Sequence, residues 1–419
     1  GLTKEPLKTV ENPATVLPNM VRVYNPLVGV GEPLTAEISK STDVAPEIAT
    51  LLRPETLRKV QKAAVLIHVE AGDGGGGSGS GWFAEPGIVV TNCHVVDMLS
   101  KSSRKPARIT VVLDSGTNSE RKLPGKLLTI NRTDDLAVIK VEGDNLPEPL
   151  KIVPSDSLVE TTRLTILGFP LGRNLARQLG MGLNVRDLQT TLKTRTTTVS
   201  GRVVQSDQSI KYVQLEGGAD PGNSGGAIVD KDGNVRLVLV AGIPGTQLVF
   251  GIPSEYPARL LQGWPIEIEP DYAYLDGSTA RQPVRIHFTD PVRRVGKASI
   301  DVWVGANGKP RKPTDKEPTR SPSDSVRETF PLRLEPDATG LFIDAVGEFP
   351  LPPRSAGQVY WLQPRFINGT GKEQWGQAIP YSPDGPPVER KPVVLQHKMP
   401  KLGAERTLEL TSQAIFQWQ

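Results

Sequence analysis

The sequence predicts an all-β protein. Three observations support this fold class: many short apolar runs, turn residues between them, and few segments with helical periodicity. Glycine and proline are abundant, at 41 and 38 of 419 residues, as expected for a loop-rich β protein. Around a dozen short strands over roughly 200 residues, with no long helix between them, are typical of a β-barrel or β-sandwich. The chain is long enough for two or three domains, each with its own core.

The first 62 residues precede the strands. Residues 1–45 are polar and proline-rich without clear periodicity, and predict an extended arm. Residues 46–62 have apolar residues at helical spacing interrupted by Pro54, which predicts two short helical turns. The chain begins with glycine instead of Met and has no basic, apolar signal segment, so we expect that an upstream segment was removed.

Residues 63–262 predict the main β domain. Its expected strands are 64–69, 82–84, 87–91, 108–113, 126–130, 136–141, 162–167, 198–205, 211–215, 236–241 and 247–252. The glycine tract at 72–81 is not followed by the Lys-Ser/Thr of a phosphate-binding loop, and predicts a flexible loop between two strands. Residues 254–262 predict a short capped helix that closes the domain.

Residues 266–390 predict a second, smaller domain that resembles a β-sandwich. Its strands are separated by turn signals, of which Asn368-Gly369 is typical of a hairpin. The segment 308–325 is rich in proline, lysine and serine and predicts a long mobile loop. Residues 391–419 predict a tail with one possible strand at 407–410.

Composition excludes several classes of partner. The net charge is only +3, from 49 basic and 46 acidic residues, so no nucleic-acid partner is expected. No apolar run approaches the roughly 18 residues that a membrane span needs. Cys93 is the single cysteine, which excludes an intrachain disulfide but leaves the cellular compartment open.

Ser224 is the candidate nucleophile. It lies in the segment 220–226, Asp-Pro-Gly-Asn-Ser-Gly-Gly, with an apolar run on each side. Glycine allows a sharp turn and frees backbone N–H groups to bind a developing oxyanion. The same residues also describe an ordinary surface turn, so the function depends on whether the chain supplies a base and a carboxylate.

His94 and Asp135 are the candidates for these roles. His94 directly follows a predicted strand, where a side chain can face a cleft; His68 is expected to pack within a strand. Asp135 directly precedes the strand 136–141, where a partly buried carboxylate could fix the tautomer of an imidazole. Asp134 is an alternative to Asp135.

No metal site or cofactor is expected from the sequence. Of the four histidines, His287 and His397 lie in the C-terminal part of the chain. Neither has a Cys, Asp or Glu at the sequence spacing of metal ligands.

Together, the segments 91–96, 134–140 and 220–226 resemble the three catalytic motifs of trypsin-like serine peptidases, with the bacterial HtrA/Deg branch as the best match. They occur in that family's order of His, Asp and Ser, 41 and then 89 residues apart. The segments 79–83, 167–172 and 250–254 are similar to further parts of the family, so the resemblance covers about 63–262. It implies a double β-barrel with the catalytic residues in the cleft between the barrels.

The resemblance also implies roles for the residues. Ser224 would attack the scissile carbonyl, His94 would take its proton, and Asp135 would orient His94. The N–H groups of Gly222 and Ser224 would form the oxyanion hole, with Asn223 shaping the turn. These roles imply a serine endopeptidase that acts through an acyl-enzyme on protein or peptide substrates.

Three departures from the family qualify this interpretation. Gly218, six residues before Ser224, is not acidic, which disfavours a trypsin-like preference for Arg or Lys. Gly218 and Gly242 are assigned to the substrate pocket, and a small or medium apolar residue before the cut is expected. Cys93 raises the idea of a thiol nucleophile, although the family places a small, core-facing residue there. No PDZ-like Gly-Leu-Gly-Phe segment follows residue 262, so cage assembly and peptide-activated regulation are not carried over from the family. Because so much of the chain lies outside the catalytic unit, the C-terminal domain is a candidate site for a regulatory protein partner.

Two other functions stay open at this stage. The chain could be a latent or inactive peptidase-fold protein that binds partners through its N-terminal arm and C-terminal β domain. All three catalytic residues are present, but the loops 172–197 and 242–247 could be displaced at rest. Glycan binding by the second domain would use Trp303, Trp361 and Trp375, although such residues more often belong to the core. A periplasmic or secreted location is expected over a cytoplasmic one.

Overall fold

A computed structural model describes residues 52–72, 75–170, 191–205, 209–217, 220, 222–242, 248–389, 393–397 and 406–410. The predicted arm 1–45 lies outside these residues. Helix α1 runs from Pro54 to Ala63 and buries Val60 and Ala63. Its proline stands in the first turn, where the missing N–H costs no hydrogen bond. Pro54 therefore begins a helix, whereas the sequence pattern predicted an interruption.

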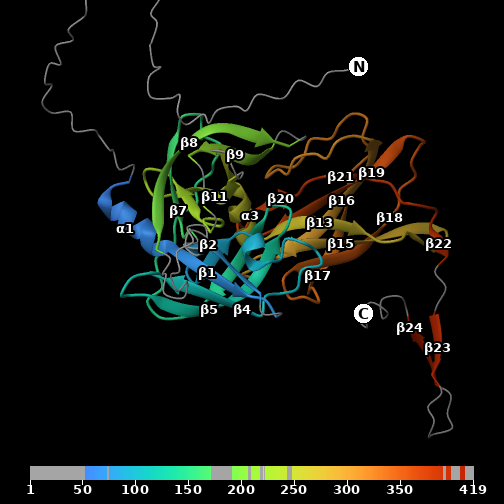
Figure 1. Cartoon of the computed structure of the whole chain (residues 1–419). Coiled ribbons are helices and arrows are strands. Elements are labelled where there is room, and N and C mark those ends of the chain that lie inside the picture. Colours follow the sequence, from blue (N-terminus) through green and yellow to red (C-terminus); the bar gives the residue numbers. More distant parts are fainter. Residues whose placement is uncertain are drawn as a thin grey trace, which may run out of the picture. The chain divides into compact units, whose positions relative to one another are not determined.

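The first six strands close into a barrel in the order β1-β2-β3-β6-β5-β4 (Figure 1, blue to cyan). They are β1 Ala64–Glu70, β2 Gly76–Glu85, β3 Ile88–Thr91, β4 Arg108–Leu113, β5 Arg121–Asn131 and β6 Leu136–Val141. On β1, Val65 and Ile67 join one apolar cluster while Leu66 joins another. Both faces of the strand are therefore packed, because successive side chains point to opposite sides of a sheet.

The glycine tract is mostly strand, which corrects the predicted flexible loop at 72–81. β2 begins at Gly76 and pairs with β1 along its length. A Cβ atom at Gly79 would approach Val95 Cγ2 to 2.5 Å, and one at Gly81 would approach Ile67 Cδ1 to 2.7 Å. These glycines let the strand pass close to its neighbours, which side chains would prevent.

The next six strands close into a second barrel in the order β10-β11-β12-β9-β8-β7 (Figure 1, green to yellow). They are β7 Arg163–Gly168, β8 Lys193–Val204, β9 Ile210–Glu216, β10 Ala227–Val229, β11 Val235–Gly242 and β12 Leu248–Pro253. Helix α3, Glu255–Gln262, follows as predicted. The two closed barrels confirm the predicted double β-barrel.

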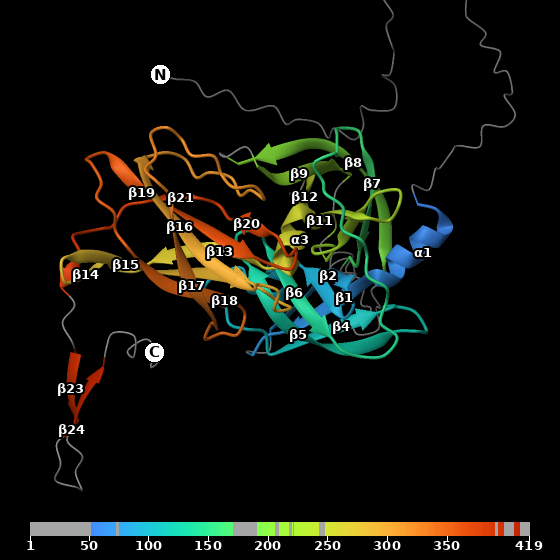
Figure 2. The same cartoon turned by 180° about the vertical axis from the view of Figure 1, so that it is seen from behind.

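The C-terminal strands form a further β domain (Figure 2). They are β13 Trp264–Pro270, β14 Tyr274–Asp276, β15 Thr279–Thr289, β16 Lys297–Ala306, β17 Glu328–Pro336, β18 Ile343–Pro350, β19 Gln358–Ile367, β20 Glu373–Trp375, β21 Ile379–Tyr381 and β22 Val388–Glu389. The β-rich character agrees with the prediction. β17 pairs with both β16 and β18, so these strands make one continuous ten-stranded sheet, and side chains of β15, β16, β18 and β19 share one buried core. The short strands β23 Val393–His397 and β24 Arg406–Leu410 pair with each other.

The segment 308–325 is hydrogen-bonded to this sheet, in contrast to the free loop that its composition predicts. Arg311 N donates to Ala378 O at 2.9 Å, and Thr314 N donates to Trp375 O at 3.0 Å. The Arg311 guanidinium also pairs with Asp324, which is 4% exposed. These contacts attach the segment at several points along its length.

The three tryptophans of the glycan hypothesis belong to the interior. Trp303, Trp361 and Trp375 are 1%, 2% and 5% exposed. Trp303 stacks on Trp361, with ring centroids 5.9 Å apart. Rings that are covered in this way cannot offer a binding platform, which argues against glycan binding through them.

A bidentate ion pair joins the C-terminal domain to the first barrel. Arg294 Nη1 and Nη2 lie 2.7 and 2.8 Å from the two carboxylate oxygens of Glu85, which is the last residue of β2. Arg294 Nη1 also donates to Leu261 O of helix α3 at 3.2 Å. One guanidinium therefore contacts both a barrel strand and the helix that ends the second barrel.

Candidate active site

His94 and Asp135 lie at the ends of two neighbouring strands of the first barrel. β3 ends at Thr91, and a 3₁₀-helix over His94–Val96 follows it. β6 begins directly after Asp135, and Thr91 pairs with Ala137 across the two strands. This pairing brings together two residues that are 41 positions apart in the chain.

Two hydrogen bonds hold His94 on Asp135. The ring Nδ1 lies 2.7 Å from Asp135 Oδ2, and the backbone N–H of His94 donates to Oδ1 at 2.9 Å. The Asn92 side-chain amide donates to Asp135 O at 2.8 Å. Asp135 is only 8% exposed, so the carboxylate is largely removed from water. An imidazole whose Nδ1 donates to a carboxylate presents Nε2 as a proton acceptor.

The geometry separates the two neighbouring acids. Asp134 Oδ1 pairs with Lys211 Nζ at 2.7 Å, and Asp134 Oδ2 accepts from Asn131 Nδ2 at 2.7 Å. Both oxygens of Asp134 are therefore engaged away from His94. Asp135 is the acid that contacts the histidine.

The Ser224 turn packs directly against the first barrel. Ser80 N donates to Ser224 O at 2.8 Å. Gly225 has a φ of +84°, and a Cβ there would overlap Ser80 O and Thr91 Oγ1. The turn therefore lies against the end of β3, within three residues of His94.

The Ser224 hydroxyl points into its own barrel. Its Oγ donates to Val240 O on β11 at 2.6 Å. Within the described part of the chain, no hydrogen bond joins Ser224 Oγ to His94. One neutral hydrogen bond is worth about 0.5–1.5 kcal/mol net, and a rotation about χ1 re-aims the hydroxyl. Since 1.4 kcal/mol is about a factor of ten in an equilibrium, this hydrogen bond favours the observed orientation by about tenfold or less.

The backbone N–H groups of the turn differ in their hydrogen bonding. Asn223 N donates to Asp220 O at 3.2 Å, and Gly225 N donates to Leu239 O at 2.8 Å. Among the described residues, neither Gly222 N nor Ser224 N has an acceptor. Asn223 is 8% exposed, and its backbone O accepts from Gly226 N at 3.0 Å, which closes the turn.

Ser80 is a buried residue of the site that sequence reasoning did not identify. Its Oγ donates to Gly222 O at 2.8 Å and accepts from Phe169 N at 2.8 Å. Its side chain therefore links β2 of the first barrel to the nucleophile turn and to the end of β7. The serine stood within the segment 79–83 that resembles the peptidase family, but nothing in its spacing indicated these partners.

Cys93 is a core residue despite its place next to His94. It is 0% exposed, and its Sγ donates to Met98 O at 3.0 Å. Burial, followed by the nearby Asp135 carboxylate, raises the pKa of the thiol to about 12. A thiol that stays protonated at neutral pH is a poor nucleophile, so the geometry argues against a thiol mechanism.

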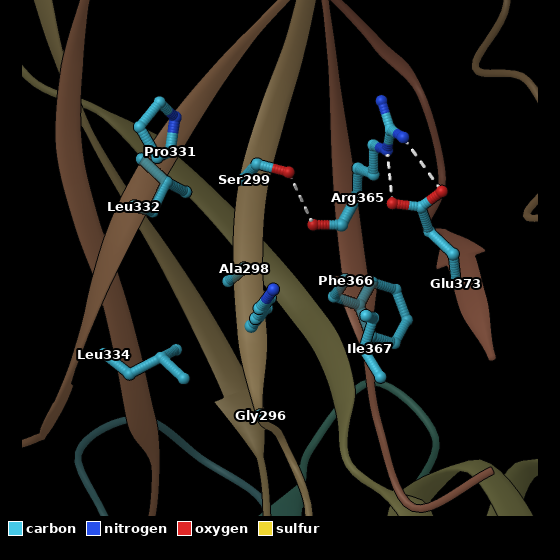
Figure 3. Close-up of a pocket in the computed structure, with 11 residues that line it drawn as sticks. Gly296, Ala298, Ser299, Pro331, Leu332, Leu334, Arg365, Phe366, Ile367 and Glu373 are labelled. Atoms are coloured by element: carbon cyan, nitrogen blue, oxygen red, sulfur yellow. Dashed lines mark hydrogen bonds and ion pairs between the residues drawn. The ribbon is translucent and has the colours of Figure 1, made fainter. Parts of the chain in front are cut away.

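The predicted substrate pocket is described only in part. Gly218 lies outside the described residues, whereas Gly242 pairs with Val249 at the end of β11. A separate cavity of about 430 Å³ lies on the C-terminal sheet and contains none of the candidate catalytic residues. Figure 3 shows its lining over β16, β17 and β19, including the Arg365–Glu373 ion pair at 2.7 Å.

Comparisons with known proteins agree with the motifs. Residues 79–236 match the family model described as trypsin-like peptidase domain. This confirms the resemblance for that part of the chain. The Do-like protease 8 of Arabidopsis thaliana chloroplasts is 28% identical over 238 residues, covering 52% of this chain and 49% of the relative. A probable periplasmic serine endoprotease, DegP-like, of Chlamydia pneumoniae is 30% identical over 184 residues, covering 43% and 32%.

The similarity is confined to part of each protein. The chain spans about half the length, or less, of these curated relatives. The solved structure of Deg5 is 22% identical and covers 49% of this chain and 90% of its own, with a TM-score of 0.37. Among the described helices, none is long and apolar enough to cross a membrane.

Proposed function

We propose that this protein is a serine endopeptidase in which Ser224 is the nucleophile, His94 the general base and Asp135 the residue that orients the base. The observation that carries the proposal is the pair of hydrogen bonds between His94 and Asp135, at 2.7 and 2.9 Å, beside the Ser224 turn. Relatives that are named as a protease and as a probable serine endoprotease provide further support.

The reaction begins when Ser224 Oγ leaves Val240 O and turns to His94 Nε2. As Oγ attacks the scissile carbonyl carbon, its proton passes to Nε2, and the imidazolium is stabilised by the Asp135 carboxylate. The proton then passes to the leaving amine, which departs as the C–N bond breaks. Water repeats the sequence on the acyl-enzyme, releases the acid product and returns the proton to Ser224.

Oxyanion stabilisation comes from the Gly222 and Ser224 N–H groups. The other turn N–H groups, of Asn223 and Gly225, are already bonded to backbone oxygens. Removal of one oxyanion donor costs on the order of 100-fold to 1000-fold in rate in comparable enzymes. Ser80 contributes indirectly, because its hydroxyl donates to the carbonyl oxygen of Gly222 and so helps to fix the residue that supplies one of these N–H groups.

The substrate is a protein or peptide. A small or medium apolar residue before the cut is our proposal, because Gly218 supplies no acid to bind Arg or Lys. The C-terminal domain is proposed to bind a regulatory protein partner. A periplasmic or secreted location is proposed on the strength of relatives that are named periplasmic.

Cleavage of a peptide library by wild-type protein and by Ser224→Ala tests the proposal. Loss of the nucleophile in such a triad lowers kcat by about 10⁶-fold, so the variant should be inactive. Its circular dichroism should match that of the wild type, and its unfolding temperature should be at most slightly lower, since the hydrogen bond from the hydroxyl to Val240 O is lost. Absence of wild-type cleavage under every condition, with folding intact, would instead support a binding or scaffold protein. Equal cleavage by Ser224→Ala would exclude Ser224 as the nucleophile.

A further inference from the structure

A second group of chemically active side chains lies on the C-terminal sheet, outside the candidate active site. β13 and β15 pair antiparallel, with Glu267 opposite His287. Glu269 lies two residues beyond Glu267 and therefore on the same face of β13. One ligand atom from each of these three residues lies within 4.8 Å of the other two. Figures 1 and 2 show β13 and β15 side by side in both views.

The imidazole of His287 is held in one orientation. Its Nδ1 lies 2.7 Å from Oδ1 of Asp344, which stands opposite His287 on β18 and is 1% exposed. Arg285 Nη1 bonds the second oxygen of Asp344 at 2.7 Å. Since the Nδ1 N–H donates to this buried acid, Nε2 faces Glu269, with 3.0 Å between Nε2 and Oε2. Histidine ligands of metal ions are usually oriented by a carboxylate in this way.

The two carboxylates beside Nε2 are open to solvent. The side chain of Glu269 is 47% exposed and that of Glu267 is 41% exposed, so an ion can reach both from solvent. Two carboxylates together neutralise the charge of a divalent cation.

We propose that Glu267, Glu269 and His287 bind a Zn²⁺ ion, with Asp344 orienting the histidine. One imidazole nitrogen and two carboxylate oxygens are a donor set that zinc accepts, with a water molecule in the fourth position. Tetrahedral zinc with bonds of about 2.1 Å separates its ligand atoms by about 3.4 Å. In the structure, the three ligand atoms lie within 4.8 Å of one another. The proposal is independent of the peptidase activity.

Lys101 connects this site to the peptidase part of the chain. Its Nζ lies 2.8 Å from Glu267 Oε1, and Lys101 follows the helical turn that carries His94. A zinc ion on Glu267 competes with this ammonium group for the same carboxylate. Removal of the lysine charge should therefore strengthen zinc binding.

Isothermal titration of ZnCl₂ into the untagged full chain tests the proposal. We expect one ion per chain. Binding should be at least tenfold weaker in Glu269→Gln and in His287→Gln, and about 10-fold to 100-fold weaker in Asp344→Asn, where only the orientation of the ligand is lost. Lys101→Met should bind more tightly than the wild type. Glu373→Gln serves as the matched control, because Glu373 is an exposed carboxylate paired with Arg365 elsewhere on the sheet.

Thermal unfolding with and without ZnCl₂ guards against variants that fail to fold. A bound ion raises the unfolding temperature of the wild type, and Glu269→Gln should keep the metal-free unfolding temperature while losing this increase. No saturable zinc binding by the wild type would overturn the proposal. So would equal affinities in the wild type, Glu269→Gln and His287→Gln, or saturable binding of CaCl₂ in place of ZnCl₂.

Discussion

In the first barrel, His94 and Asp135 are joined by two hydrogen bonds, and a third from Asn92 fixes the Asp135 backbone. In the second barrel, Ser224 stands in a tightly packed turn, but its hydroxyl donates to Val240 O. One half of the candidate site thus has its proposed base and carboxylate assembled, whereas in the other half the hydroxyl of the proposed nucleophile is bonded to Val240 O. The difference indicates that preorganisation of this site resides in the turn backbone and in the His94–Asp135 pair.

The largest loss of activity should follow from a substitution in the His94–Asp135 pair. Asp135→Asn keeps the shape of the side chain but favours the wrong tautomer of His94, and should lower kcat by about 10⁴-fold. Peptide cleavage measures this loss. Asp134→Asn is the matched control. Because Asp134 pairs with Lys211, this substitution should not lower kcat to a comparable extent. Equal losses in the two variants would contradict the assignment of Asp135.

An intermediate loss of activity should follow from removal of the Ser80 hydroxyl, which links the first barrel to the Ser224 turn. Ser80→Ala leaves Gly222 O and Phe169 N without their partner, and an unsatisfied buried group costs about 1–3 kcal/mol. A displaced oxyanion turn should lower kcat by on the order of 100-fold with little change in KM.

Ser200→Ala is the control for Ser80→Ala. The Ser200 hydroxyl is buried and has no hydrogen-bond partner in the described part of the chain. Its loss should lower neither kcat nor the unfolding temperature. A Ser80→Ala enzyme that is destabilised but keeps the wild-type kcat would show that Ser80 stabilises the fold without positioning the turn.

The smallest predicted effect concerns Cys93, the buried neighbour of His94, and the pH dependence of stability. Because the pKa of Cys93 is raised to about 12, the folded state keeps this proton at pH values where the unfolded chain, with an ordinary thiol pKa of 9.0, releases it. The stabilising contribution is complete below about pH 9 and is lost as the pH rises towards 12. The free energy of unfolding, measured with a denaturant at several pH values across this range, should fall more steeply for the wild type than for Cys93→Ala. Parallel pH profiles would contradict the raised pKa.

The sequence predicted those features that depend on neighbours in the chain. Runs of β-branched and apolar residues located most strands of both barrels, and His94 and Asp135 were found because each stands at a strand end. The three motifs then indicated the double barrel. The hydroxyl orientation depends on Val240, which no local pattern connects to the serine.

Features that depend on pairing between distant strands could not be predicted. The glycines of β2 were interpreted as a loop, because their close contacts with Ile67 and Val95 arise only when the barrel closes. His287 was judged to have no metal-ligand neighbours, because Glu267 reaches it across two paired strands, at no spacing typical of a motif. Likewise, the partners of the Ser80 side chain come from two distant segments of the chain, at Phe169 and Gly222.

Covalent labelling with a fluorophosphonate probe tests the central claim most directly. An activated serine reacts with the phosphorus atom, fluoride leaves, and the chain gains one phosphonyl group that intact-mass and peptide mass spectrometry can locate. We predict a single adduct on Ser224 in the wild type, strongly slowed labelling in Asp135→Asn and none in Ser224→Ala. A folded wild-type protein that remains unlabelled, or an adduct that persists in Ser224→Ala, would contradict the assignment of Ser224 as an activated nucleophile.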